Sequence, residues 1–252
     1  MHRALPSFIG QPSEDLASIL APFAVCDKES IAMSTIKESV EALLKKSPYS
    51  ASNQAALEAC VDAQAGGGCP YYMDANRSLL KLYQFSPQSA NETKVSLILL
   101  LALLEFPSTD VLALSYLVPE RFQKAEPCAT ILKCTNLLES CKFTEFWEAF
   151  GAMEGGSEIK AIASGSTERL QRSIIEVLSL SYRSSKLSKI LPALHMSSGA
   201  ELSKLNHPSV ESVDGDTVYF VPTAENTKRN RVFQDGVNYG AIASMMAKVS
   251  NE

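Results

Sequence analysis

The stretch VSLILLLALLEF, residues 95–106, constrains the fold of this chain more than any other part of its sequence. It offers about a dozen apolar residues, whereas a helix that crosses a bilayer needs roughly 20. Glu105 and Pro107 close the stretch, so it is too short to span a membrane. A helix that is apolar on nearly every side has to be covered on every side. We therefore expect residues 95–106 to form the central core helix of an array of other helices.

Most of the sequence before residue 184 has the apolar spacing of amphipathic helices. Residues 167–184 illustrate it, because Leu170, Ile174 and Val177 recur at helical intervals. The AGGGCP segment, residues 65–70, cannot continue a helix and marks a loop. Paired antiparallel helices with short links predict a stacked helical-repeat domain. We find no fixed repeat motif that would name the repeat class.

The pattern changes after residue 184. Two short helical segments, SKLSKILPAL and SGAELSKLN, are followed by a stretch with a period of two residues. In that stretch Val218 and Phe220 face one way and Tyr219 the other. Asp214-Gly215 predicts a tight two-residue hairpin turn. The order helix, helix, strand, turn, strand predicts a winged-helix domain.

A last helix is predicted in NYGAIASMMAKV, near the end of the chain. Ile242, Met245, Met246 and Val249 lie on one face of it. Met-rich faces adapt to different partners. This stripe either packs back on its own domain or joins a helical bundle between subunits.

Composition argues against a nucleic-acid-binding protein. The chain is 46% hydrophobic and 20% charged, with a net charge of -5, and phosphate binding needs clustered Lys and Arg. The second helix of the predicted winged helix carries one Lys and one Glu, so direct nucleic-acid contact is weak at most. The dense basic cluster TKRNR supplies Lys228, Arg229 and Arg231. These residues either contact RNA or an acidic partner, or belong to a solvated loop.

Catalytic and metal-binding patterns are missing from the sequence. The six Cys form no C-x-x-C pair, and the three His lie far from them in sequence. No G-x-S-x-G, G-x-x-x-x-G-K or H-E-x-x-H motif is present. We therefore predict no catalytic, cofactor-binding or metal-binding residues, and hence no enzyme. The start of the chain lacks the apolar stretch of a signal peptide, so we expect the cysteines to be reduced thiols.

Two aromatic segments allow more than one interpretation. Phe143, Phe146, Trp147 and Phe150 follow i, i+3, i+4, i+7 spacing, which favours a joint between helices over a groove for a partner helix. In KLYQF, residues 81–85, either Tyr83 and Phe85 are exposed for recognition, or Leu82 and Phe85 finish a buried helix face.

Three segments carry a resemblance to a known family. They are DANRSLLKLYQFSP, LLESCKFTEFWEAF and YGAIASMMAKVSNE. In this order they resemble the subunit k family of eukaryotic translation initiation factor 3, a PCI-type scaffold subunit. The resemblance implies a mainly α chain with a HEAT-like helical-repeat domain, a winged-helix domain and a C-terminal helix. The expected bounds are 1–30 for an N-terminal extension, then 31–184, 185–233 and 234–252.

The resemblance also implies a function. It is that of a non-catalytic structural subunit in the cytoplasm, which docks on neighbouring PCI subunits, subunit l foremost, and supports assembly on the 40S ribosomal subunit. Winged helices of such subunits associate side by side, so we expect Val218, Tyr219 and Phe220 to pair along an exposed strand edge. Ile242, Met245, Met246 and Val249 are the other interface candidates.

Three alternatives remain at this point. Within the same class, the chain is a small PCI subunit of the signalosome or the proteasome lid. In other classes, it is a winged-helix nucleic-acid-binding protein or an unrecognised hydrolase.

Overall fold

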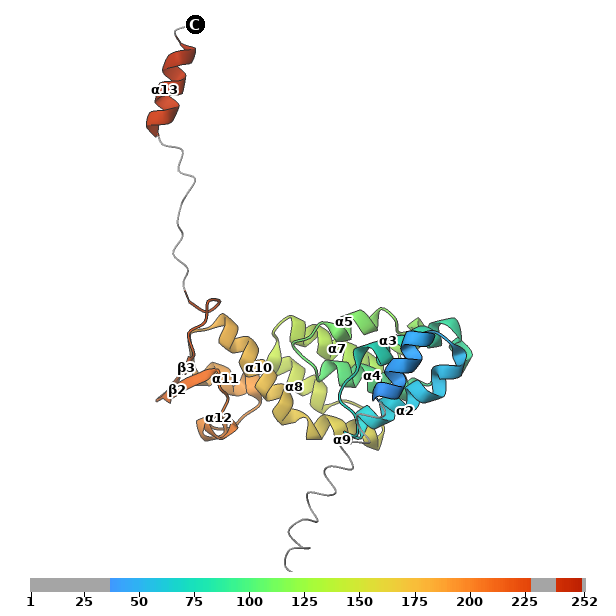
Figure 1. Cartoon of the computed structure of the whole chain (residues 1–252). Coiled ribbons are helices and arrows are strands. Elements are labelled where there is room, and N and C mark those ends of the chain that lie inside the picture. Colours follow the sequence, from blue (N-terminus) through green and yellow to red (C-terminus); the bar gives the residue numbers. More distant parts are fainter. Residues whose placement is uncertain (1–36, 228–238, 251–252) are drawn as a thin grey trace, which may run out of the picture.

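Helices make up most of the computed structural model, which describes residues 37–227 and 239–250 (Figure 1). Residues 37–46 are helical. The elements that follow are η1 (Ala51–Asn53), α2 (Gln54–Ala65), α3 (Met73–Phe85), η2 (Pro87–Ser89), α4 (Glu92–Leu103), α5 (Asp110–Ser115), α6 (Glu120–Gln123), α7 (Cys128–Glu139), α8 (Phe143–Gly151), α9 (Ser157–Gly165), α10 (Thr167–Ser181), β1 (Ser184–Lys186), α11 (Leu187–Leu194), α12 (Gly199–Leu205), β2 (Val210–Asp214), β3 (Thr217–Phe220) and α13 (Tyr239–Val249). The prediction of a mainly α chain is confirmed.

Helix α4 lies at the centre of the core, as its sequence predicts. Its apolar residues from Val95 to Leu103 are buried on nearly every side of the helix. Asn91 caps its start, because the side chain accepts a hydrogen bond of 3.0 Å from the backbone N–H of Thr93. The helix ends at Leu103, three residues earlier than expected, since the chain turns ahead of Pro107.

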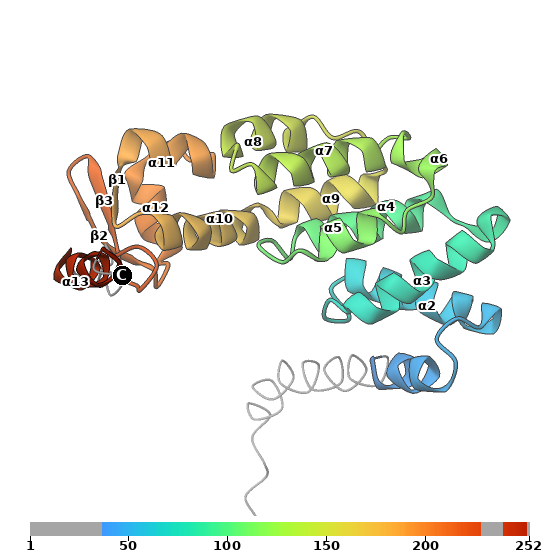
Figure 2. The same ribbon diagram turned by 90° about the horizontal axis from the view of Figure 1, so that it is seen from above.

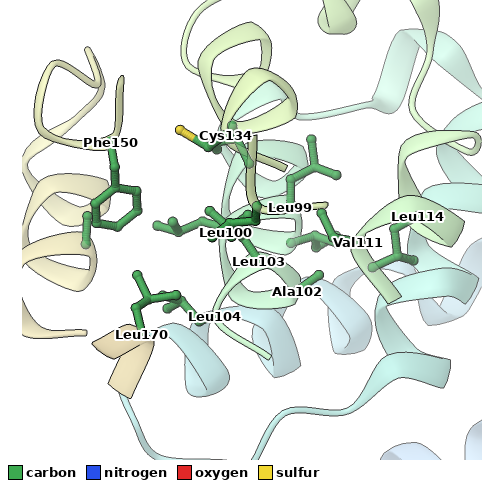
Figure 3. Close-up of a cluster of buried hydrophobic side chains, with 14 of the residues drawn as sticks. Leu99, Leu100, Ala102, Leu103, Leu104, Val111, Leu114, Cys134, Phe150 and Leu170 are labelled. Carbon is green, nitrogen blue, oxygen red and sulfur yellow. The ribbon is translucent and has the colours of Figure 1, made fainter. Parts of the chain in front are cut away.

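Other helices cover α4 from several directions. α2, α5, α7 and α9 all pack against it, and α7 packs in turn on α8 (Figures 1 and 2). Figure 3 shows Phe150 of α8 and Leu170 of α10 reaching the same cluster as Leu100, Leu103 and Leu104. The prediction of stacked helices around residues 95–106 is therefore confirmed.

A buried amide pair joins α2 to α3. Gln64 and Asn76 exchange two side-chain hydrogen bonds of 3.1 Å each. The Gln64 oxygen also accepts from the backbone N–H of Tyr72 at 3.0 Å. Both side chains are buried, and a satisfied buried pair of this kind fixes one arrangement of the two helices.

A three-stranded antiparallel sheet follows the helical array. Its strand order is β1-β3-β2, and α11 and α12 lie between β1 and β2 in the chain. The predicted order of two helices, strand, turn and strand is present. The additional strand β1 has the sequence SSK, which has neither apolar alternation nor β-branched residues and so gave no signal.

The hairpin turn is shifted by one residue from its predicted centre. Asp214 pairs with Thr217, so Gly215 and Asp216 are the two loop residues. Gly215 has a φ of 56°, in the left-handed region that glycine tolerates best. A glycine in that conformation at the first loop position is typical of a type II′ turn.

The prediction that the strand around Val218–Phe220 has an exposed edge is wrong. β3 is the central strand, with β1 on one side and β2 on the other, because the unpredicted SSK strand covers it. Val218 and Phe220 are 0% and 1% exposed, so both belong to the core and are not available at a free edge. Tyr219 points the other way, as predicted, and is 38% exposed.

Within residues 37–227 and 239–250, no helix combines the length and the apolar character needed to cross a bilayer.

Candidate interaction surfaces

The apolar face of α13 is the most exposed predicted surface in the described parts of the chain. Ile242 is 43% exposed, and Met245, Met246 and Val249 are each 68–71% exposed. The helix stands clear of the remaining elements in Figure 1. The four predicted residues therefore lie on one accessible helix face. An exposed apolar helix face of this kind is a candidate interaction surface.

The open face of the sheet is a second candidate surface. Tyr219 and Val221 are both 38% exposed and lie on the face opposite Val218 and Phe220. Arg183 and Glu211 form an ion pair of 2.8 Å beside it. The free edges belong to β1 and β2, so a partner strand would have to add to one of these rather than to β3.

The aromatic cluster of α8 joins the helical array to the segment around the sheet. Phe143, Phe146, Trp147 and Phe150 are all buried, which confirms the predicted packing role. The Trp147 Nε1–H donates a hydrogen bond of 2.9 Å to the carbonyl oxygen of Ala193. Its ring also stacks on His195, with 5.7 Å between centroids and an angle of 25°.

The partners of Trp147 were not predictable from sequence spacing. Ala193 and His195 lie more than forty residues further along the chain. His195 ends α11 with a φ of 54°, a conformation that is uncommon for residues other than glycine. From this position the His195 ring stacks on Trp147 of α8. A lone histidine in the sequence carries no signal of it.

A pocket of about 490 Å³ opens beside this joint. We call it the α8–α9 pocket, and its apolar lining consists of Trp147, Phe150, Met153 and Ala163. Glu154 and Lys160 also line it. Sequence analysis did not predict it, because its walls come from three helices and the residue that ends a fourth.

The two aromatic residues of the KLYQF segment differ in burial. Tyr83 is fully buried and donates a hydrogen bond of 2.8 Å to Glu58 Oε1. Burial, together with the nearby Glu58 carboxylate, raises the pKa of the Tyr83 hydroxyl well above its usual range. Phe85 is 68% exposed and contacts Tyr49 edge to face. A buried Tyr83 and an exposed Phe85 match neither interpretation completely.

The cysteines in the described residues are free, and all except Cys141 are buried. Burial raises the pKa of the Cys134 thiol to about 12 and also raises the pKa values of Cys60 and Cys128. These three thiols therefore stay protonated at neutral pH and are poor nucleophiles. Within residues 37–227 and 239–250, no group of three or more His, Cys, Asp or Glu side chains is placed to hold a metal ion.

Some predictions fall outside the described residues. The basic cluster Lys228, Arg229 and Arg231 lies there, and so does the N-terminal extension 1–30. The domain limits at 184 and 233 and the partner contacts of Tyr219 and of the α13 face stay predictions.

Comparison with known proteins shows the family to which the chain belongs. Residues 89–231 match the model of the CSN8/PSMD8/EIF3K family, which is more than half of the 252 residues. The match includes the α8 cluster and the sheet.

Individual relatives agree with this match. Eukaryotic translation initiation factor 3 subunit K of Dictyostelium discoideum is 34% identical over 146 residues, 58% of this chain and 57% of the relative. The human protein of the same name is 27% identical over 199 residues, 79% of this chain and 89% of the relative. The zebrafish (Danio rerio) protein is 27% identical over 201 residues, with the same coverage. These matches confirm the resemblance seen in the three sequence segments, and the chain belongs to the CSN8/PSMD8/EIF3K family.

Proposed function

We propose that this chain is a non-catalytic structural subunit of eukaryotic translation initiation factor 3. It docks on neighbouring PCI subunits, subunit l foremost, and through them supports assembly of the factor on the 40S ribosomal subunit in the cytoplasm. The relatives named as subunit K of this factor support the assignment. The structural observation that carries it is the exposed apolar face of α13.

A helix like α13 gains its stability from a partner. It has 11 residues, and isolated helices shorter than about 12–15 residues are marginal in water. Fully burying one Ile, Val or Met side chain contributes about 1.5–3 kcal/mol. Four such side chains on one face, Ile242, Met245, Met246 and Val249, suit a helix that enters a groove or bundle formed by other helices.

The sheet supplies a second contact in this proposal. Tyr219 presents a half-exposed aromatic ring on the open face, and tyrosine is enriched at protein interfaces because its ring is apolar and its hydroxyl polar. Val218 and Phe220, which the sequence placed in the contact, support it from the core beneath. We infer that a neighbouring winged helix packs beside Tyr219 and the β2 edge.

Direct binding to nucleic acid plays at most a small part in this function. The net charge of -5 does not favour neutralisation of a phosphate backbone. Lys228, Arg229 and Arg231 are the residues we propose for any contact with ribosomal RNA or with an acidic surface of a partner.

Affinity purification of the tagged full chain, followed by mass spectrometry, tests the proposal. We expect the other subunits of initiation factor 3 and 40S proteins to co-purify. Recovery of signalosome or proteasome-lid subunits instead would assign the chain to a sister complex. Recovery of the chain alone, at a tag position that leaves α13 free, would contradict the structural role altogether.

A further inference from the structure

Four apolar residues that line the α8–α9 pocket are nearly buried. Trp147, Phe150, Met153 and Ala163 are each 5–7% exposed and all line the pocket. Phe146, the neighbour of Trp147 on the same helix, is fully buried and does not line it. The pocket therefore has an apolar wall beside the core, and the polar residues Glu154, Lys160, Ser164, Thr167 and His195 complete its lining. Its volume of about 490 Å³ falls in the range of about 300–1,000 Å³ that ligand-binding sites occupy.

We propose that, in the isolated chain, α13 folds back and inserts its apolar face into the α8–α9 pocket. The occupant is thus a segment of the same chain. The contact would keep Ile242, Met245, Met246 and Val249 covered until a partner takes the helix. It is made without any partner, so its test does not depend on the proposed function.

The length of α10 gives the distance that α13 would have to cover to reach the pocket. Asn226 lies at the C-terminal end of α10, where its side-chain amide donates a hydrogen bond of 2.8 Å to the carbonyl oxygen of Ser179. The pocket lies at the other end of this helix, where Thr167 lines it. Twelve residues of α-helix separate Ser179 from Thr167, which is about 18 Å.

The connection between the described parts of the chain is longer than this distance. Twelve peptide units join Thr227 to Tyr239, and twelve residues span at most about 40 Å. The upper limit of the reach is therefore roughly twice the distance along α10.

Chemistry at the pocket also suits α13. The methionines on its face can adapt to an irregular apolar wall. Lys248 lies in the last turn of α13, and Glu154 lines the pocket, so the two can pair when the helix is docked. Gly151 leaves an opening in the wall, because a Cβ added there would meet no atom within 4 Å.

Energy transfer from Trp147 tests the contact, since Trp147 is the only tryptophan of the sequence. We would place a dansyl acceptor on Ser244→Cys, which is on the exposed side of α13 away from the apolar face. The full-length chain would carry Cys26→Ser and Cys141→Ser, which removes the exposed thiol of Cys141 and that of Cys26. We expect strong energy transfer that does not change on dilution.

A matched pair of variants separates docking from chance proximity. Gly151→Leu fills the pocket, and Gly156→Leu makes the same change at another open position, which lines a different cavity near Ile159. We expect Gly151→Leu to abolish the energy transfer and Gly156→Leu to preserve it, with both variants keeping the parent's helical circular dichroism spectrum.

Three outcomes would overturn the proposal. The first is weak transfer in the parent chain, and the second is equal transfer in the two glycine variants. The third is transfer that disappears on dilution, which would mean that α13 docks on a second copy of the chain.

Discussion

Helices α4 and α13 are both rich in apolar residues, yet α4 is buried and the apolar face of α13 is exposed. α4 is buried on nearly all sides by its neighbours in the same chain. On α13, the four large apolar side chains of one face remain 43–71% exposed. The difference lies in how the residues are distributed. α4 is apolar all round and has to be surrounded by other helices. α13 is apolar on one face only, so a single complementary surface is enough to bury that face.

The comparison teaches that a similar apolar content can serve stability or recognition. Burial of α4 contributes to the free energy of folding of the isolated chain. Burial of the α13 face contributes mainly to the free energy of docking, because it requires a surface on which the helix can dock. The following experiments test this separation, beginning with the largest expected effect.

Leu100→Ala should strongly destabilise the chain. Leu100 is fully buried on α4, and removing such a side chain costs about 2–5 kcal/mol, including the cavity that remains. The matched change Met246→Ala on α13 should cost clearly less, because Met246 can stabilise the isolated chain only through docking of α13 on the α8–α9 pocket. Urea unfolding followed by circular dichroism measures both. Equal losses would show that α13 belongs to the folded core, against the comparison.

Trp147→Phe should weaken the joint between the helical array and the sheet. The change removes the donor to the carbonyl oxygen of Ala193, and an unpaired buried polar group costs about 1–3 kcal/mol. We expect hydrogen exchange to accelerate in α11 while the rate in α2 and α3 stays unchanged. Uniform acceleration throughout the chain would mean that Trp147 supports the whole fold rather than this joint.

Gln64→Leu should cost about 1–3 kcal/mol, because Asn76 then keeps a buried amide without its partner. The double variant Gln64→Leu with Asn76→Leu should lose less than the sum of the two single variants, since no polar side chain of the pair remains unpaired. A double-mutant cycle in urea measures the coupling. Additive losses would exclude the amide pair as a cooperative unit.

The smallest expected effect concerns His207. Burial lowers the pKa of its imidazole, with Arg172 acting in the same direction and Glu176 against it. Because the folded-state pKa lies below the unfolded value of about 6.5, the contribution of His207 is complete above that pH and is lost as the pH falls toward the lowered pKa. His207→Asn should flatten the decrease in stability below about pH 6.5. A melting-temperature profile that keeps its shape would contradict this assignment.

The core was predictable because its signals are local. The apolar run of residues 95–106 and the aromatic spacing of α8 each determine which face is buried, and the structure confirms both. The alignment of the four apolar residues on one face of α13 also follows from their spacing within one helix. Exposure of its whole apolar face could not be predicted, because it depends on whether another part of the chain covers it.

Features that depend on contacts between distant parts of the chain could not be predicted from the sequence. The strand SSK has no alternation of its own, and its pairing with β3 turns the predicted edge into the centre of the sheet. The stacking of His195 on Trp147 joins the C-terminal end of α11 to the middle of α8, and no motif connects the two. The α8–α9 pocket exists only after α8, α9 and α10 have packed.

The most direct test of the account is the binding of a stripe variant to initiation factor 3. Met245→Asp with Met246→Asp places two charges on the apolar face of α13, far from the α4 core. We predict that this full-length variant no longer co-purifies with the other subunits, while its helical circular dichroism spectrum equals that of the unmodified chain. Undiminished co-purification of the variant would show that the α13 face does not attach the chain to the factor.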